Sequence, residues 1–225
     1  MYIKGEYNVY RNIKKIKLAY ITPFSIVINF LILFFYIVPF FVADKDEPLP
    51  LYIIIFIAFW LMCVVVSLIQ EKRHSKVKIS KISVIRYLIV DILSAYVMPL
   101  ALSTIYVFAS ELMSINAFNI WLSLLVCTFI SWLGMHMFLF SEFQIGVLFK
   151  KSIFKLLGIL LMIVGFIYIA YLGFHVPIYD EDSNKFIWLS LIVIIASHAF
   201  MIRPYFNLGL FFESLSIGSE KENWN

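Results

Sequence analysis

Residues Leu51 to Ser67 read LYIIIFIAFWLMCVVVS, and the run continues without a charged side chain as far as Gln70. A helix needs about 20 apolar residues to cross the hydrocarbon core of a bilayer. A strand of an outer-membrane barrel would instead alternate polar and apolar side chains over about 10 residues. Leu51–Gln70 shows no such alternation and therefore predicts a membrane-spanning helix.

Five further stretches have a similar length and apolar character. They are approximately Leu18–Ala43, Tyr87–Ser110, Asn116–Phe140, Ile153–Phe174 and Phe186–Ile202. Backbone groups find no water inside a bilayer, so a spanning segment must be a helix or part of a closed barrel. We therefore expect an all-α polytopic membrane protein with six transmembrane helices in one domain over residues 18–202.

The composition excludes a soluble globule. Hydrophobic side chains make up 63% of the 225 residues and charged side chains 14%, whereas soluble domains are near 45–50% apolar and 25% charged. The two cysteines, Cys63 and Cys127, both lie inside apolar stretches and form no CxxC or Cys/His spacing. No disulfide framework, no metal site and no nucleic-acid partner is expected.

The basic residues predict the orientation. Of the 18 Lys and Arg residues, 16 precede the first span, follow the sixth, or lie between the second and third or the fourth and fifth. The alternate connections hold only Lys45 and Lys185 beside several acidic residues. Because basic flanks stay in the cytoplasm, we expect a multi-pass plasma-membrane protein with both termini inside and residues 203–225 as a cytoplasmic tail.

Residues 1–17 precede the first span and carry five basic side chains. Val9, Ile13, Ile16 and Tyr20 recur at helical spacing, mostly away from those charges. This pattern is typical of an amphipathic helix in the plane of the inner headgroups. The alternative is a basic flank that only orients the first span.

Residues 71–86 form the longest and most basic inner connection, yet they are too apolar for a plain loop. Val77, Ile79, Ile82 and Ile85 stand among the basic residues and could form a short helix with one apolar side. Such a helix is suited to docking in a partner's groove. A loop whose lysines contact lipid phosphates remains the alternative.

The order of these parts resembles the six-helix permease subunit of type-2 ABC exporters. The resemblance rests on Gln70-Glu71-Lys72-Arg73 and on the run KISVIRYLI at 81–89, which enters the third span. Many members have a longer re-entrant hairpin between the fifth and sixth spans than residues 174–185 allow, which implies a reduced outer gate. Permeases of about this length occur in peptide and bacteriocin export or self-protection systems of Gram-positive bacteria.

The resemblance implies a separate ABC ATPase that docks on the connection and a second permease copy or paralogue. ATP and Mg would then bind to the partner subunit and no cofactor to this chain. The ATPase contacts implied by the resemblance are Lys76, Val77, Lys78, Ile79, Ser80, Lys81, Ile82, Ser83 and Ile85.

Motifs for catalysis are missing from the chain. No GxxxxGK[ST] phosphate cradle occurs, so the chain cannot bind ATP in that manner. GxSxG and HExxH are also absent, and we name no catalytic residue. A membrane cysteine peptidase remains an enzymatic alternative, although His74 lies at the inner face while both cysteines lie deeper in their spans.

Four ionisable residues lie within the spans or just beyond them, all toward the cytoplasm: Asp91, His136, Glu142 and His198. Such residues are costly in lipid and often functional. Brought together, they could form a polar gate or bind the cationic part of a cargo. The simpler interpretation is local pairing near the interface, with the histidines bonded to nearby carbonyls.

We therefore expect a non-enzymatic permease subunit that moves a hydrophobic or amphipathic peptide, such as a toxin or bacteriocin, with energy from the partner ATPase. The first alternative is a stand-alone immunity or signalling membrane protein. The second is the cysteine peptidase. The lipid bilayer is the surrounding medium in every case.

Overall fold

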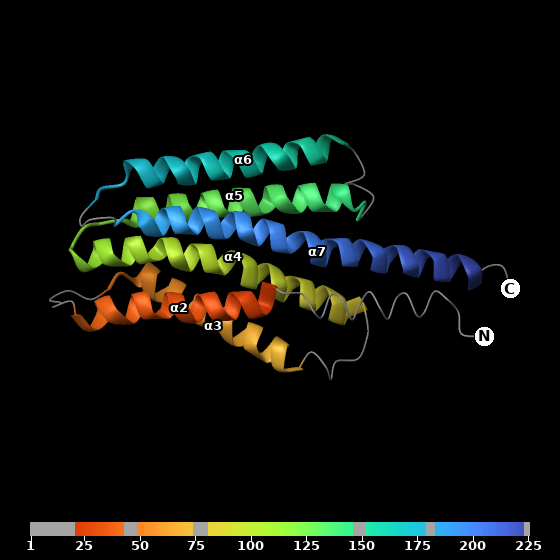
Figure 1. The fold of residues 1–225 in the computed structure, drawn as a ribbon, viewed down its shortest axis with the longest axis horizontal. Coiled ribbons are helices and arrows are strands. Elements are labelled where there is room, and N and C mark those ends of the chain that lie inside the picture. Colours follow the sequence, from red (N-terminus) through yellow and green to blue (C-terminus); the bar gives the residue numbers. More distant parts are fainter. Residues whose placement is uncertain (1–20, 43–48, 74–80, 146–151, 179–182, 223–225) are drawn as a thin grey trace.

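A computed structural model describes residues 21–42, 49–73, 81–145, 152–178 and 183–222 of the chain (Figure 1). These residues form six helices and no strand, which confirms the all-α fold class. The predicted amphipathic helix over 1–17 and residues 74–80 of the inner connection lie outside the described residues. The helices are α2 (Ile21–Val42), α3 (Leu51–Arg73), α4 (Lys81–Leu112), α5 (Phe118–Glu142), α6 (Ser152–His175) and α7 (Lys185–Glu222).

Five of these helices, α3 to α7, are long and apolar enough to cross a membrane. The apolar segment of α2, Ile21–Ile37, is shorter within the described residues. At about 1.5 Å per residue, the 22 residues of α2 still extend about 33 Å, close to the thickness of the hydrocarbon core. The described residues are therefore compatible with a polytopic membrane protein.

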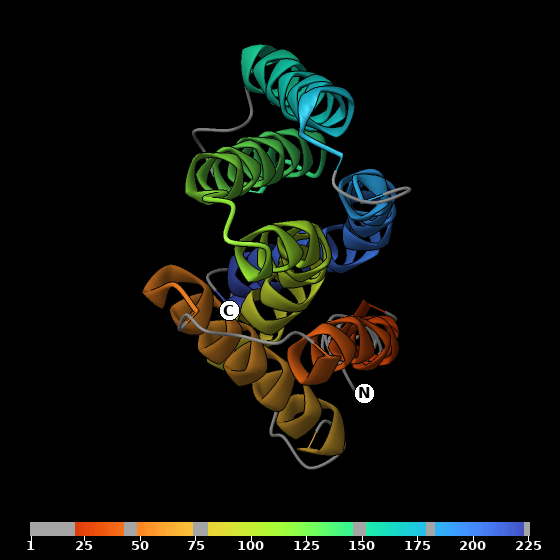
Figure 2. The ribbon, with the colours of Figure 1, turned by 90° about the vertical axis from the view of Figure 1, so that its left-hand side faces the viewer.

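Helix α4 is the central element of the bundle. In the candidate span of α4, 78% of the residues are buried, compared with 17% in the span of α6 and 28% in the span of α3. Figures 1 and 2 show α2 and α3 on one side of α4, α5 and α6 on the other, and α7 alongside it. Because α4 is covered on most sides, its buried polar residues face other helices rather than lipid.

Successive helices run in opposite directions, so that their ends alternate between the two ends of the bundle (Figure 1). The ends predicted to face the cytoplasm, namely the first residues of α2, α4 and α6 and the last residues of α3, α5 and α7, share one end. We call this the inner end. This is the arrangement that the alternating basic connections require of an antiparallel bundle.

Helix α7 differs from its predicted boundary at residue 202. It continues through Pro204 to Glu222 and extends past the other helices at the inner end (Figure 1). The physical reason is that Tyr205, Leu208 and Phe211 are buried and continue the apolar stripe toward the first turns of α4. Residues 203–213 are therefore packed against the bundle, and their position on the cytoplasmic side stays a prediction.

Helices α5 and α6 approach each other at their backbones. A Cβ atom added to Gly134 would lie 2.6 Å from the carbonyl oxygen of Gly158, and one added to Gly165 would lie 2.8 Å from Cβ of Ser131. Small residues permit such contact, which replaces the hydrophobic driving force that lipid cannot supply. We call this contact the glycine seam, formed by Gly134, Gly158, Gly165, Ser131 and Cys127.

Candidate functional site

Asp91 is the most deeply placed acidic residue that the structure describes. It lies in the third turn of α4 and is 1% exposed. Its Oδ1 atom accepts a hydrogen bond of 2.9 Å from the Thr22 hydroxyl on α2. Its Oδ2 atom is buried and has no hydrogen-bond partner among the residues that the structure describes. Asp91 thus makes an interhelical contact with one oxygen while the other is left unsatisfied.

Hydrogen bonds of serine hydroxyls extend this contact between α2 and α4 to a third helix, α3. The Ser25 hydroxyl donates to the Ser94 carbonyl at 2.9 Å, one helical turn along both α2 and α4 from the Thr22–Asp91 bond. The Ser94 hydroxyl is 2.6 Å from the Ser67 hydroxyl of α3. Spacings of three residues place Thr22 with Ser25, and Asp91 with Ser94, on shared helix faces.

The side-chain amide of Asn29 extends these contacts by one more helical turn away from the inner end. Asn29 Nδ2 donates to the carbonyl and the hydroxyl of Ser25, and Trp60 Nε1 donates to Asn29 Oδ1 at 2.6 Å. All of these side chains are buried. We call the group the polar seam, formed by Thr22, Ser25, Asn29, Trp60, Ser67, Asp91 and Ser94.

The two predicted gate histidines occupy a separate place between α5 and α7. The Tyr205 hydroxyl is bonded to Nδ1 of His136, while His198 Nδ1 lies 2.6 Å from the Ile194 carbonyl. Tyr96 of α4 lies near both rings, and its ring centroid is 6.4 Å from that of His136 and 5.5 Å from that of His198. Each histidine is therefore held by a local partner, as the simpler interpretation expected for His198.

Glu142 lies at the surface near the inner end and forms an ion pair with Lys155 of α6. The four predicted gate residues thus fall into three arrangements: Asp91 against α2, the histidines between α5 and α7, and Glu142 at the surface. No hydrogen bond joins Asp91 to either histidine among the described residues. A single gate that contains all four is not what the described residues form.

The first turns of α4 carry the described part of the predicted ATPase contact. Ile82 is 80% exposed and Ile85 is 41% exposed, and Ile89 continues the same face one turn further. Ser83 is buried and does not lie on this exposed face, and its role as a partner contact stays a prediction. Of the other predicted contacts, Lys76–Ser80 lie outside the described residues, and the Lys81 side chain is not described.

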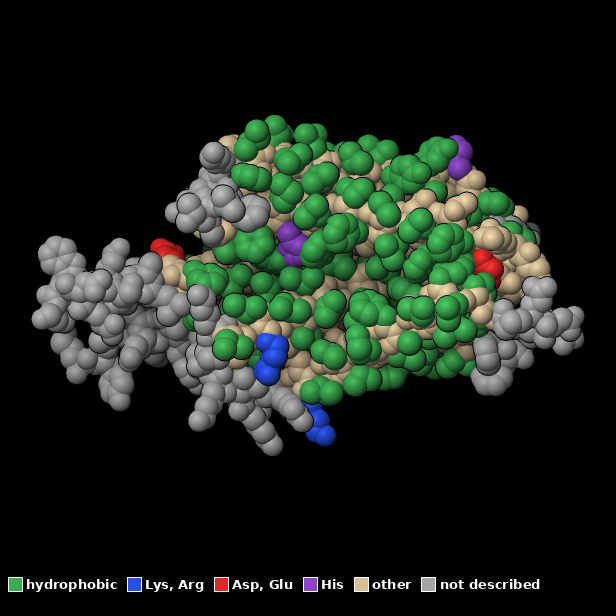
Figure 3. Space-filling model, turned by 180° about the vertical axis from the view of Figure 1, so that it is seen from behind, with side chains coloured by type: hydrophobic (Ala, Val, Ile, Leu, Met, Phe, Trp, Pro, Cys, Tyr) green, Lys and Arg blue, Asp and Glu red, His purple; other side chains and the backbone are tan. Residues whose placement is uncertain are grey.

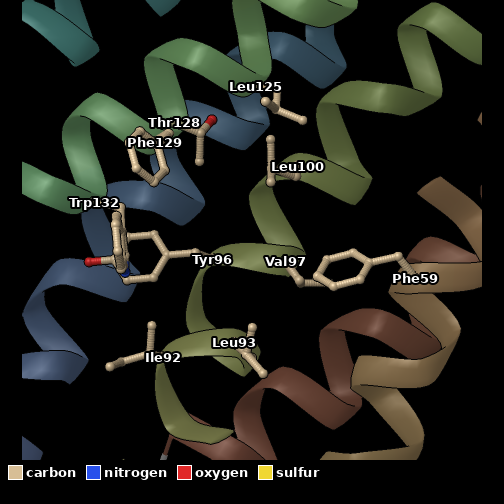
Figure 4. Close-up of a pocket in the computed structure, with 10 residues that line it drawn as sticks. All are labelled: Phe59, Ile92, Leu93, Tyr96, Val97, Leu100, Leu125, Thr128, Phe129 and Trp132. Atoms are coloured by element: carbon tan, nitrogen blue, oxygen red, sulfur yellow. The ribbon is translucent and has the colours of Figure 1, made fainter. Parts of the chain in front are cut away.

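Two hollows lie beside α4. One, with a volume of about 110 Å³, is at the inner end between α3 and α4, where Gln70 and Arg86 are among its lining residues. The other, of about 210 Å³, opens between α3 and α5 over the middle of α4 (Figure 4). Phe59, Val97 and Trp132 are among the almost entirely apolar side chains that line it.

The described residues contain no group of three or more His, Cys, Asp or Glu side chains that could hold a metal ion. Cys63 and Cys127 are both buried and free. No hydrogen bond joins either thiol to a histidine within the described ranges. His74, the histidine of the peptidase alternative, lies outside them.

Sequence reasoning missed most of the polar seam. Thr22, Ser25, Ser67 and Ser94 are single hydroxyl residues inside apolar runs, and such residues are common in membrane helices. A usable signal was present in the spacing of Thr22, Ser25 and Asn29, which marks one face of a helix. The spacing alone does not name the helix that this face meets.

A family model described as a domain of unknown function, DUF5079, matches residues 8–222. The chain belongs to the DUF5079 family. No curated protein and no solved structure is significantly similar to it. The family match includes the extension of α7 beyond residue 202, so this extension lies within the family's domain.

Proposed function

We propose that this DUF5079 protein is a non-enzymatic integral membrane subunit that docks a cytoplasmic partner at its inner end. The observation that carries the proposal is the exposed apolar face of Ile82 and Ile85 at the start of α4. That face directly follows the most basic connection of the chain. An apolar face beside basic side chains suits a protein partner that carries an acidic rim around an apolar groove.

The resemblance of residues 70–73 and 81–89 to type-2 ABC exporters supports an ATPase as that partner. In this proposal the chain is one of two permease subunits in the plasma membrane of a Gram-positive bacterium, with both termini in the cytoplasm. Nucleotide-driven closure of the ATPases would push on the 71–86 connection. Because α4 contacts helices on most of its sides, a push at its first turn would reach the rest of the bundle.

The cargo in this proposal is a hydrophobic or amphipathic peptide. Apolar side chains cover the middle of the face in Figure 3, and charged side chains are sparse there. The described polar side chains of the polar seam point between helices and not toward that surface. A path along the outside of such a bundle favours an apolar cargo over a hydrophilic solute.

Partner capture tests the proposal. The tagged full chain is purified in mild detergent from its native cells, and ABC ATPases that co-purify are identified by mass spectrometry. We expect the ATPase to co-purify and the double variant Ile82→Ser, Ile85→Ser to lose at least tenfold of it. Leu51→Ser is the matched control, because Leu51 is 70% exposed at the other end of the bundle. Equal ATPase recovery with all three proteins would refute this docking surface.

A stand-alone immunity or signalling protein is the second candidate. It is favoured by the internal pairing of most polar side chains in the described bundle, which lines no polar route through the protomer. Cells that express the chain without any partner ATPase would then remain protected against a membrane-active peptide. Protection that disappears when the ATPase gene is deleted would contradict this candidate and favour the exporter.

A further inference from the structure

The unsatisfied oxygen of Asp91 carries an inference that goes beyond the proposed docking function. Asp91 lies ten residues into α4, about 15 Å from the first residue of that helix at 1.5 Å per residue. It is buried, and no Lys or Arg side chain of the described residues pairs with it. Ionisable groups at such positions mark functional sites by default because isolating them from water is costly.

In neither protonation state does the Oδ2 atom of Asp91 find a hydrogen-bond partner among the described residues. An ionised carboxylate would be a buried charge without a counter-charge, because its described partner is the neutral Thr22 hydroxyl. A protonated carboxyl could donate from Oδ1 to the Thr22 hydroxyl, but its Oδ2 atom would still have no hydrogen-bond partner among the described residues. A bound cation beside Oδ2 resolves both problems, since it neutralises the charge and uses the free lone pairs.

The surroundings of Asp91 supply oxygen atoms from three helices. The Thr22 hydroxyl is in direct contact with the carboxyl. One turn further along α2 and α4, the Ser25 hydroxyl bonds to the Ser94 carbonyl, and the Ser94 hydroxyl bonds to the Ser67 hydroxyl of α3. Carboxylate, hydroxyl and carbonyl oxygens are the ligands that hard cations select, whereas soft metals select nitrogen and sulfur. The donor set therefore favours a hard cation.

The charge of the site selects a monovalent cation. Asp91 is the one acidic side chain in the polar seam, and Glu71 acts on it only at longer range. One carboxylate balances one positive charge, whereas a divalent ion would leave an uncompensated charge in an apolar interior. We propose that Asp91, with the hydroxyls of Thr22, Ser25, Ser67 and Ser94, forms a Na⁺ site that joins α2, α3 and α4.

Sodium-dependent stability tests this site in the purified full-length protein in detergent. Thermal unfolding is followed by tryptophan fluorescence in NaCl, KCl or choline chloride at equal ionic strength. We expect Na⁺ to raise the Tm by about 5 °C at concentrations well above its Kd, because a ligand that binds only the folded state stabilises it. Equal Tm values in the three salts would overturn the proposal.

Variants locate the effect. Asp91→Asn keeps the shape of the side chain and removes its charge, so we expect the Na⁺-specific rise to disappear. Glu142→Gln is the matched control, since Glu142 is an exposed acid, and it should keep the full rise. A Na⁺-specific rise that persists in Asp91→Asn would overturn the proposal, because the ion would then bind elsewhere.

Direct binding of radioactive ²²Na⁺ keeps the proposal testable if Asp91→Asn fails to fold. The wild-type protein should bind Na⁺ in competition with unlabelled Na⁺, and Thr22→Val should lower the affinity at least tenfold. Absence of saturable binding to the wild type would overturn the site. A wild type that gains stability only on acidification would also overturn it, because Asp91 would then hold a proton in place of Na⁺. No ATPase is present in these measurements, so their outcome is independent of the docking proposal.

Discussion

The polar seam and the glycine seam join helices of one bundle by opposite means. In the polar seam, hydroxyl, amide and carboxyl side chains connect α2, α3 and α4. In the glycine seam, missing side chains let the backbones of α5 and α6 touch. Lipid tails are as apolar as the helices, so both devices replace the hydrophobic drive that water supplies to soluble bundles.

The difference between the two seams indicates which helix contact can change its arrangement when a ligand binds. The glycine seam has no free polar atom and no room for an added methyl group, so it permits one arrangement. The polar seam contains an unsatisfied carboxyl oxygen and several hydroxyls that can rotate. We therefore expect ligand binding to shift the position of α2 relative to α4, whereas α5 and α6 should move together as one unit.

The largest loss of folding stability is expected when a large side chain is introduced into the glycine seam. Gly134→Leu would force a side chain into the Gly158 carbonyl and should destabilise the folded protein by about 3 kcal/mol or more. Unfolding in detergent by SDS titration measures this loss. Leu157→Ala is the control, because Leu157 neighbours Gly158 but is exposed. A stability loss in Leu157→Ala equal to that in Gly134→Leu would refute the special role of the seam.

A smaller loss of folding stability is expected when the side-chain amide of Asn29 is removed from the polar seam. Asn29→Ala removes the acceptor of the Trp60 indole N–H and should cost about 1 kcal/mol, the usual scale for hydrogen bonds between membrane helices. A double-mutant cycle with Trp60→Phe isolates the pair. Strict additivity of the two single losses would show that this contact contributes nothing.

The smallest loss of folding stability is expected when the Ser67 hydroxyl is removed. Ser67→Ala loses the bond to Ser94 and a bond to the carbonyl of Cys63 in its own helix, with an expected cost of about 0.6 kcal/mol. Ser190→Ala loses only a bond within its own helix and serves as the control. The difference between the two losses measures the interhelical hydroxyl pair, and equal losses would assign it no stability.

The sequence predicted the helices because their apolar length is a local property. Gly158 and Gly165 could be recognised as one small face of a helix, but their partner Gly134 lies on another span and has no local signature. Asp91 was identified as costly, yet its partner Thr22 is 69 residues earlier. Pairing between helices depends on how they rotate and tilt, which a single sequence does not encode in any short pattern.

The length of α7 depends on tertiary packing and not on a local pattern. A charge and a proline at positions 203 and 204 interrupt the apolar run and favour a helix end there. The helix continues because burial of Tyr205 and Leu208 outweighs the backbone hydrogen bond that Pro204 cannot donate. Tertiary packing decided this boundary, and it was not visible in the sequence.

The unbroken course of α7 has a consequence for insertions and deletions. Ser197 is bonded to the Ala95 carbonyl of α4, while Tyr205 meets His136 of α5 two turns later. One residue inserted between these positions would rotate everything beyond it by about 100°. Tyr205, Leu208 and Phe211 would then turn away from their neighbours. This segment should therefore tolerate substitutions on its outer surface far better than any change in its length.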